Sequence, residues 1–393
     1  MESTPKNGAV VVLPSGLDER IFACPIIEGP DGRADFAKVW VFSVGDQRFS
    51  AADVVDAAWF RGDLGGLWRE ILRGAAAEGR AGKEGSEPKS EILQDLSEIF
   101  RSERDLITAE ETENWLEARG LTLGDFNDFI HREYWRRRGT PACSPADLDY
   151  ADVALRDRRH FIKEVLFSGR FESLARRLSW AVVARLAAEP PARVSPNCLE
   201  AEREGFFQRT ESRPDQLSSY LRWAGRDLSW FEGMVEVEAG YRCYCHQIVT
   251  PENRARTMAA LRLPLTSFRV EMMDLESDEA AREAVLCLES DGLSMEGLAR
   301  QEGCLVERQR FLLEEFPEGL QRRILGAEAG RAFRLAASDN RFQVCRVVRK
   351  TPPCLEDDKV LKRVDEELLS SHFGNLEAKH VHWLVGREIV CEP

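Results

Sequence analysis

The spacing of apolar residues changes at Pro264, and this change constrains the fold more than any other feature. Before it, apolar residues recur at helical spacing over long stretches, as in the segment 90–100. After it, the segment LTSFRVEMMDL alternates apolar and polar residues as a strand does. The chain therefore predicts a mainly helical part followed by a part that contains a sheet, which is the α+β class.

The segment after Pro264 predicts a compact order of elements. Ser277 and Ser294 are typical first residues of two successive helices. An extended stretch over 305–313 and a short helix over 317–325 follow. Two apolar stretches, AFRLAAS and RFQVCRVVRK, then predict strands joined by a turn around Asp339 and Asn340. Residues 264–350 thus predict the order β-α-α-β-α-β-β.

The rest of the chain predicts further segments around this compact one. We expect a β-rich segment over 1–49, a helical domain over 50–138, a second helical domain over 150–260, the compact domain over 264–350 and a C-terminal helix within 355–385. The small, charged stretch 74–90 is typical of a flexible connection. The last helix carries an apolar stripe, so we expect it to pack back on the helical region.

The two helical domains contain similar sequences. ENWLEARGLTLGDF matches SSYLRWAGRDLSWF at a constant offset of 105, which pairs Gly120 with Gly225 and Phe126 with Phe231. Helix-glycine-helix units share such a pattern often, so chance explains the match as well as duplication does. A true duplication would make the second domain a copy of the first, because this period is too long for a solenoid repeat.

Charge and apolar content exclude some classes of protein. The 54 basic and 68 acidic residues give a net charge of −14, which disfavours a nucleic-acid binder. The arginines of 132–138 and 156–185 alternate with acidic residues, as on a solvated face. No stretch of about 18 consecutive apolar residues is present, so we expect no membrane span. The first residues lack a secretory signal pattern, and we expect a cytoplasmic protein.

Motifs for cofactors, metals and nucleophilic catalysis are weak. The sequence has no phosphate-binding glycine motif and no recognisable hydrolase spacing. Cys243, Cys245 and His246 resemble a metal cluster, but three ligands within four residues cannot easily enclose a tetrahedral ion. The sequence leaves open whether they bind a metal, and buried structural cysteines are the simpler reading. We predict no cofactor, no metal site and no assigned catalytic residue.

Residues 264–350 resemble a parvulin-type peptidyl-prolyl isomerase domain. The resemblance is carried by DGLSMEGLARQEG, by FPEGLQRRILGAEAG and by the closing hairpin. The helical part, with WLEARGLTLGDF and the long C-terminal helix, resembles the chaperone region of SurA-like and PpiC-related proteins, among them peptide-maturation accessory proteins. Over about residues 36–385, the resemblance implies a helical chaperone region, a small parvulin-like domain and a returning C-terminal helix.

The chain departs from the parvulin pattern where the chemistry would be. Parvulins usually place a histidine on the first strand and another on the last, and none of the six histidines here lies within 264–350. The corresponding stretch of the first strand holds Arg269, Val270 and Glu271, and that of the last holds Gln343 and Val344. Isomerisation breaks no covalent bond and needs an apolar pocket with groups that favour the twisted amide. A domain without those groups can still bind peptides.

The residues therefore leave three functions open. The first is a peptide- or protein-binding accessory protein with a degenerate parvulin-like domain, acting on a client polypeptide. The second is an active prolyl isomerase that uses substitutes such as Glu271, Gln343 or Cys345. The third is a structural subunit of a larger assembly. The sequence names neither the client nor the oligomeric state.

For the peptide-binding function, six apolar side chains are candidates for the floor of a binding surface. They are Phe268, Met272, Phe311, Phe316, Phe333 and Phe342. Strand alternation places Phe268, Val270 and Met272 on one face, and Phe342 with Val344 on one face of the last strand. If those faces coincide, the six form one apolar surface; the alternative is that they fill the domain core.

Overall fold

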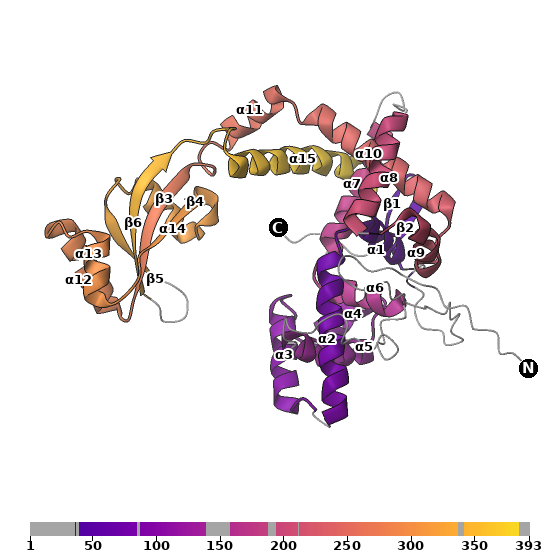
Figure 1. Ribbon diagram of the computed structural model, residues 1–393, viewed down its shortest axis with the longest axis horizontal. Coiled ribbons are helices and arrows are strands. Elements are labelled where there is room, and N and C mark those ends of the chain that lie inside the picture. Colours follow the sequence, from indigo (N-terminus) through magenta and orange to yellow (C-terminus); the bar gives the residue numbers. More distant parts are fainter. Residues whose placement is uncertain are drawn as a thin grey trace, which may run out of the picture. The chain divides into compact units, whose positions relative to one another are not determined.

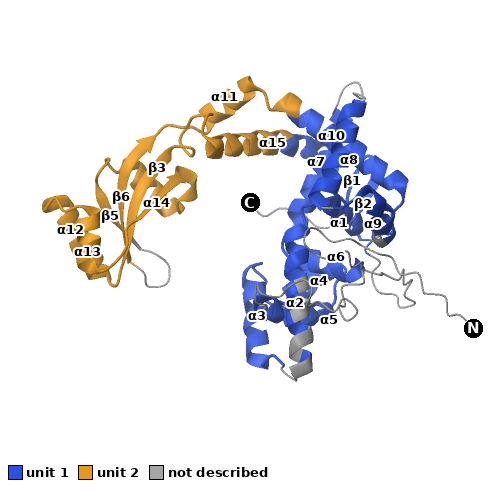
Figure 2. Cartoon of the chain, viewed as in Figure 1, with its two compact units in different colours: residues 1–245, 373–393 blue, residues 246–372 orange. Residues whose placement is uncertain are grey.

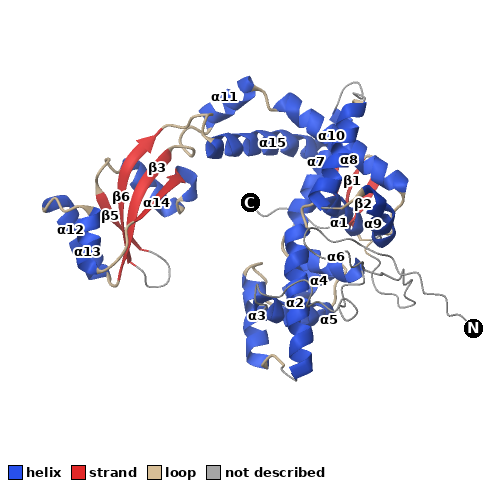
Figure 3. Cartoon of the chain, in the orientation of Figure 1, coloured by secondary structure: helices blue, strands red, loops and turns tan. Residues whose placement is uncertain are grey.

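The computed structural model describes residues 39–84, 87–138, 158–187, 194–210, 212–336 and 342–384, together with Phe36. Helices dominate, and the strands form two small antiparallel sheets (Figure 1, Figure 3). The protein is therefore of the α+β class, as the sequence predicts. Most of the predicted β-rich segment 1–49 lies outside the described residues.

The chain forms two compact units (Figure 2). Unit 1 comprises residues 1–245 and 373–393, and unit 2 comprises residues 246–372. The chain passes from one unit to the other within α10 (Leu228–Ile248) and again within α15 (Asp358–His380). Unit 2 is thus inserted into unit 1 along the sequence.

Unit 1 holds a three-stranded sheet and most of the helices. Its strands are β1 (Trp40–Val44), β2 (Gln47–Ser50) and β7 (Val381–Trp383). Its helices before α10 are α1 (Ala51–Phe60), α2 (Gly65–Glu84), α3 (Ser90–Ser102), α4 (Ala109–Glu117), α5 (Leu123–Arg138), α6 (Arg158–Phe167), α7 (Phe171–Ala187), α8 (Pro196–Thr210), the 3-10 turn η3 (Pro214–Gln216) and α9 (Leu217–Ala224). Ser50 caps α1 in a capping box with Asp53, as the sequence pattern predicts.

The sheet of unit 1 joins the two ends of the described chain. The strand order is β2-β1-β7, and β7 pairs antiparallel with β1. Phe42 lies opposite Trp383 in the register, with ring centroids 5.3 Å apart. Residues from Phe373 onward belong to unit 1, where the Phe373 ring stacks on Trp180.

The prediction of a flexible connection over 74–90 is wrong for most of its length. Helix α2 continues to Glu84 and packs along α5. A Cβ built on Gly74 would lie 3.3 Å from the Cα atom of Arg136, so the missing side chain lets the two helices approach closely. The alanines of this stretch favour helix. Gly74, which resembled part of a linker, is here a point of close contact between two helices.

The two similar sequences have the same local structure. Gly120 and Gly225 follow α4 and α9 with φ angles of 66° and 62°. After each glycine, a backbone N–H bonds back to the last turn, from Leu121 to Leu116 (2.9 Å) and from Arg226 to Leu221 (2.8 Å). Both are common glycine-dependent helix ends, so a duplication stays a prediction.

Unit 2 confirms the predicted order of elements. It contains α11 (Pro251–Ala260), β3 (Ser267–Leu275), α12 (Asp278–Ser290), α13 (Met295–Glu302), β4 (Glu307–Leu312), the 3-10 turn η4 (Leu313–Glu315), α14 (Glu318–Gly326), β5 (Ala332–Ala336) and β6 (Phe342–Thr351). The sheet is antiparallel with the order β4-β3-β6-β5. The predicted turn around Asp339 and Asn340 lies outside the described residues.

The sheet of unit 2 has a packed core on each face. On one face, Phe268, Val270, Cys345 and Val347 pack against η4 and α14. On the other face, the buried residues come from the sheet and from α12 and α13: Met273, Leu275, Ala281, Ala284, Met295, Leu298, Ala299, Ala332 and Val344. Helices α12 and α14 therefore cover opposite faces of the sheet.

Candidate functional site

The structure buries three of the six predicted peptide-binding residues. Phe268, Phe316 and Phe333 are at most 7% exposed and lie in the core on the α14 face of the sheet. Phe268 and Phe316 meet edge to face, with ring centroids 6.1 Å apart. Their burial follows from strand alternation, because that face meets α14 rather than solvent.

The other three residues do not complete a single floor. Met272 and Phe311 are half-buried against the same core as Phe268. Phe342 packs with Val344 on the opposite face, beside α12 and α13. The two predicted faces therefore do not coincide, because β6 turns its Phe342 side away from the Phe268 side of β3. Peptide binding by any of the six stays a prediction.

The three substitute groups for isomerase chemistry are also separated. Glu271 lies on the α12 and α13 side of β3 and receives bonds from Arg308 (3.1 Å) and Arg346 (3.0 Å). Burial alone would raise the pKa of Glu271, but these two guanidinium groups lower it below its ordinary value. The carboxylate is thus held charged within an ion-pair row across β4, β3 and β6.

Gln343 and Cys345 lie on the other side of β6. The Gln343 amide donates to Asp274 across the strand pair (2.6 Å). Cys345 is fully buried, and burial raises the pKa of its thiol to about 12. The thiol packs in the core, as its position in the strand predicts, and does not meet Glu271.

An open groove of about 640 Å³ runs along β5 in unit 2. Its floor is the start of β5 with Arg331, and its walls are α12 and the end of α14. The lining residues are Arg282, Val285, Leu286, Glu289, Arg323, Gly326, Ala327, Arg331, Ala332, Phe333 and Arg334. Phe333 is thus the one member of the six candidates that also lines this groove.

The groove follows from the position of β5 at the edge of the sheet. Among the described strands, β5 pairs with β6 alone. Ser277 caps the start of α12 by accepting a hydrogen bond from Ala280, and α12 packs against one face of the sheet. Helix α14 covers the other face and ends at Gly326. The open backbone edge of β5 therefore lies between two helices.

Four arginines and one glutamate line the groove. Arg331 bonds Glu289 near the end of α12 (3.2 Å), and Arg334 bonds Asp278 at its start (2.5 Å). Arg282 shares Asp278 (2.8 Å). On the opposite wall, Arg323 donates to the carbonyl oxygen of Arg334 (3.0 Å). Positive charge thus gathers along this edge of an acidic protein.

Sequence reasoning missed this groove. The arginines are scattered over α12, α14 and β5, and no short motif joins them. The one available signal was the spacing of Arg331 and Arg334 around the first strand of the closing hairpin. The groove forms only where α12, α14 and β5 pack together in space. The pattern of residues along the sequence does not show that packing.

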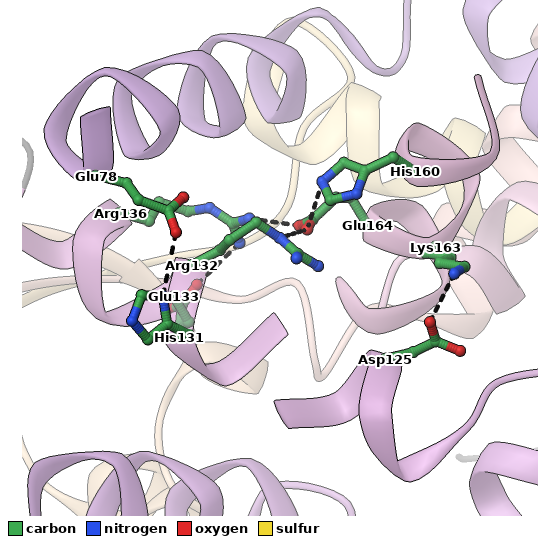
Figure 4. A network of polar contacts seen from close by, with 9 residues as sticks. All are labelled: Glu78, Asp125, His131, Arg132, Glu133, Arg136, His160, Lys163 and Glu164. Atoms are coloured by element: carbon green, nitrogen blue, oxygen red, sulfur yellow. Dashed lines mark hydrogen bonds and ion pairs between the residues drawn. The ribbon is translucent and has the colours of Figure 1, made fainter. Parts of the chain in front are cut away.

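A second polar network lies in unit 1 (Figure 4). Glu164 on α6 is fully buried and is bonded by Arg132 (2.6 Å) and Arg136 of α5. Burial alone would raise the pKa of Glu164, but the two arginines lower it below its ordinary value. Lys163 pairs with Asp125 in the same helix contact (2.6 Å). The interpretation of 132–138 as a solvated face is therefore corrected: Arg132 and Arg136 fix α5 to α6.

The cysteine cluster lies on α10. Cys243, Cys245 and His246 share that helix, and Cys243 meets Cys198 of α8. Within the described residues, no group of three or more His, Cys, Asp or Glu side chains is arranged to hold a metal ion. Over the same part of the chain, no helix has the length and apolar character needed to cross a bilayer.

The chain matches no protein-family model and no curated protein. Solved structures with some likeness include the foldase protein PrsA of Streptococcus pneumoniae, at 11% identity and a TM-score of 0.24, covering 59% of this chain and 88% of that one. PrsA from Bacillus subtilis is 14% identical with a TM-score of 0.19, covering 56% and 83%.

A third structure comes from a study of two SurA-like chaperones of Campylobacter jejuni, PEB4 and Cj1289. It is 10% identical with a TM-score of 0.19 and covers 58% of this chain and 89% of that one. These proteins belong to the foldase and SurA-like group that the sequence resembles.

Proposed function

We propose that the protein binds extended segments of a client polypeptide in the groove along β5, as a chaperone-like accessory protein. The observation that carries the proposal is the groove whose floor is β5, an edge strand that pairs with β6 alone among the described strands. Arg323 donates to the Arg334 carbonyl oxygen of β5 (3.0 Å), and an added segment would displace this contact. An extended segment can add to such an edge as a further strand, so that its main-chain groups bond to the sheet.

The two edges of the sheet differ in a way that favours β5. The outer edge of β4 carries four consecutive exposed polar or charged residues, Glu307, Arg308, Gln309 and Arg310. Charged side chains along an edge are a common protection against strand addition. The edge of β5 also has charged neighbours, but it differs in opening into a groove with Val285, Leu286 and Ala327 in its walls, which offers apolar contact beside the backbone.

Binding without catalysis fits the separated polar groups of this domain. Glu271 is engaged by two arginines, while Cys345 is buried on the other face. Neither lines the groove. A place in peptide maturation and a cytoplasmic location belong to the same proposal, and both rest on the sequence alone.

The proposal is tested with a substitution that fills the groove and leaves the core of the domain intact. Gly326 lines the groove, and a Cβ added there meets nothing within 4 Å. Gly326→Trp should therefore obstruct the groove without disturbing the fold. Gly319 lies on the same helix, also has open space around a built Cβ and does not line the groove, so Gly319→Trp is the matched control.

The readout is fluorescence anisotropy of labelled ten-residue peptides, one of alternating Gln and Thr and one of alternating Glu and Thr. We expect at least a tenfold loss of affinity in Gly326→Trp and full binding in Gly319→Trp. Methylation of alternate peptide nitrogens should also abolish binding, because strand addition needs those N–H groups. Failure of the full chain to bind either peptide would end the proposal, as would equal binding by both variants.

A further inference from the structure

We infer that the β5 groove selects acidic extended segments, with carboxylates at alternate positions facing the α12 wall. This inference rests on the proposed function and adds the chemical class of the client. It follows from the charges that line the groove and from their unequal distribution between the two walls.

The charge of the groove is opposite to that of the protein. The whole chain carries −14, whereas four of the eleven lining residues are arginines and one is a glutamate. Such a local concentration of one sign attracts a ligand of the other sign and orients it during the encounter. Carboxylates are the matching groups in a polypeptide, because guanidinium binds them through two parallel N–H bonds.

Three of the four arginines gather at the α12 wall. The side chains of Arg282 and Arg331 are 65% and 63% exposed, and that of Arg334 is 36% exposed. Their acidic partners within the domain are Asp278 and Glu289. A guanidinium has five N–H donors, and these contacts occupy only some of them. Donors therefore stay available to a bound carboxylate at both ends of the wall.

The α14 wall is less polar. Its one arginine, Arg323, donates to the Arg334 carbonyl and lies over the Phe333 ring at 5.4 Å from the centroid. Gly326 and Ala327 form the rest of that wall. Successive side chains of an added strand point to opposite faces. Residues i and i+2 would therefore face the arginines of α12, while the residues between them would face small or apolar groups.

A nucleic acid would supply negative charge of another kind. Four arginines beside an unpaired backbone edge match an extended peptide better than a phosphate chain, because the edge needs N–H and C=O partners in register. The overall charge of −14 also opposes long polyanions. A ten-residue oligo-thymidylate serves as the probe for this alternative.

The first experiment compares peptides on the full chain. The Glu–Thr peptide should bind at least tenfold more tightly than the Gln–Thr peptide, and a Lys–Thr peptide should bind more weakly than either. A peptide with the same composition in the order Glu-Glu-Thr-Thr should lose most of the gain, because its carboxylates then face both walls. The advantage of the acidic peptide should shrink as salt rises.

The second experiment removes two of the charges. The double variant Arg282→Gln with Arg331→Gln should bring acidic and neutral peptides to within threefold of each other, because the affinity for the Glu–Thr peptide falls. The matched control is Arg300→Gln with Arg349→Gln, since both residues are exposed in the same unit and neither lines the groove.

The outcomes separate this inference from the proposed function. Equal binding of acidic and neutral peptides would overturn the acidic preference and leave strand addition standing. Tighter binding of the oligo-thymidylate than of any peptide would overturn the inference in favour of a phosphate chain. Binding of no peptide would overturn both. A preserved preference in the groove variant would place acidic recognition elsewhere and overturn this site.

Discussion

The rings of Trp180 and Phe373 stack in unit 1, with centroids 5.3 Å apart and planes 14° from parallel. The indole N–H of Trp180 also donates to Glu377 (2.9 Å), which accepts from Trp383 as well (3.1 Å). Phe373 is fully buried and meets Tyr241 with centroids 5.1 Å apart. Residues almost two hundred positions apart thus share one aromatic core.

Phe373→Ala should destabilise unit 1 by about 3–5 kcal/mol, because it removes a buried ring and leaves a cavity. Chemical denaturation followed by tryptophan fluorescence measures the loss. Gly374→Ala, at the neighbouring exposed position where a built Cβ meets nothing within 4 Å, is the control and should not lower stability. Equal stability of Phe373→Ala and the parent would contradict the packing described for α15.

Glu164→Gln should cost about 3–5 kcal/mol, because it leaves the charges of Arg132 and Arg136 beside a buried neutral amide. Glu133→Gln also removes a partner of Arg136 (2.9 Å), but Glu133 is 20% exposed and its loss should cost less. Urea denaturation of both variants gives the comparison. A smaller loss for Glu164→Gln than for Glu133→Gln would rule out the buried pair as the stronger contact.

The same carboxylate predicts a pH dependence. The pKa of Glu164 is lower in the folded chain than its ordinary value of 4.5. Its stabilising contribution is therefore complete above the unfolded pKa and is lost as pH falls through the folded pKa. The parent should lose more stability than Glu164→Gln between pH 5 and pH 3. Parallel stability curves for the two proteins would contradict this assignment.

Gly74→Val should destabilise the contact of α2 with α5 by about 1–3 kcal/mol, because overpacked side chains force helices apart. Gly82 lies on the same helix, and a Cβ built there meets nothing within 4 Å, so Gly82→Val is the control. Thermal melting of both variants tests the difference. A similar melting temperature for the two would show that the close approach at Arg136 does not constrain this pair.

The thiols should react at very different rates. Hydrogen bonds from Ser195 and Cys243 lower the pKa of Cys198, whereas burial raises that of Cys345 to about 12. Thiolate is the reactive form, so iodoacetamide at pH 8 should label Cys198 well before Cys345 in peptide mass spectra. Labelling of Cys345 before Cys198 in the native protein would contradict the described core.

Phe311→Ala and Phe342→Ala test the predicted apolar floor. Both side chains are half-buried, against opposite cores of unit 2. We expect each to lower the melting temperature without a specific loss of peptide affinity, because neither lines the β5 groove. A loss of binding at unchanged stability in either variant would restore that residue to the binding surface.

The element order of unit 2 could be predicted because alternation and capping are local. Phe268, Val270 and Met272 share one strand face, and Ser277 and Ser294 begin helices, as their sequence patterns indicate. These properties depend on neighbours within a few residues. The prediction of a linker over 74–90 was wrong because the glycine at position 74 serves the close approach of α2 to Arg136, a residue far along the chain.

The groove could not be predicted for a related reason. Each of its arginines resembles a solvated residue in its own segment, and only the packing of α12 and α14 on opposite faces brings them to one strand edge. The buried pairs of Glu164 likewise depend on how α5 meets α6. Ion pairs between residues so far apart in the sequence produce no periodic pattern in it.

The pairing of β7 with β1 has a consequence for synthesis on the ribosome. Val44 lies opposite Val381 in the register, so β1 can pair with β2 early, but its other edge has no partner until all of unit 2 has been translated. At about 5–20 residues per second, that delay is on the order of 20–70 seconds. During that delay the nascent unit 1 exposes one edge of β1 to other chains near the ribosome.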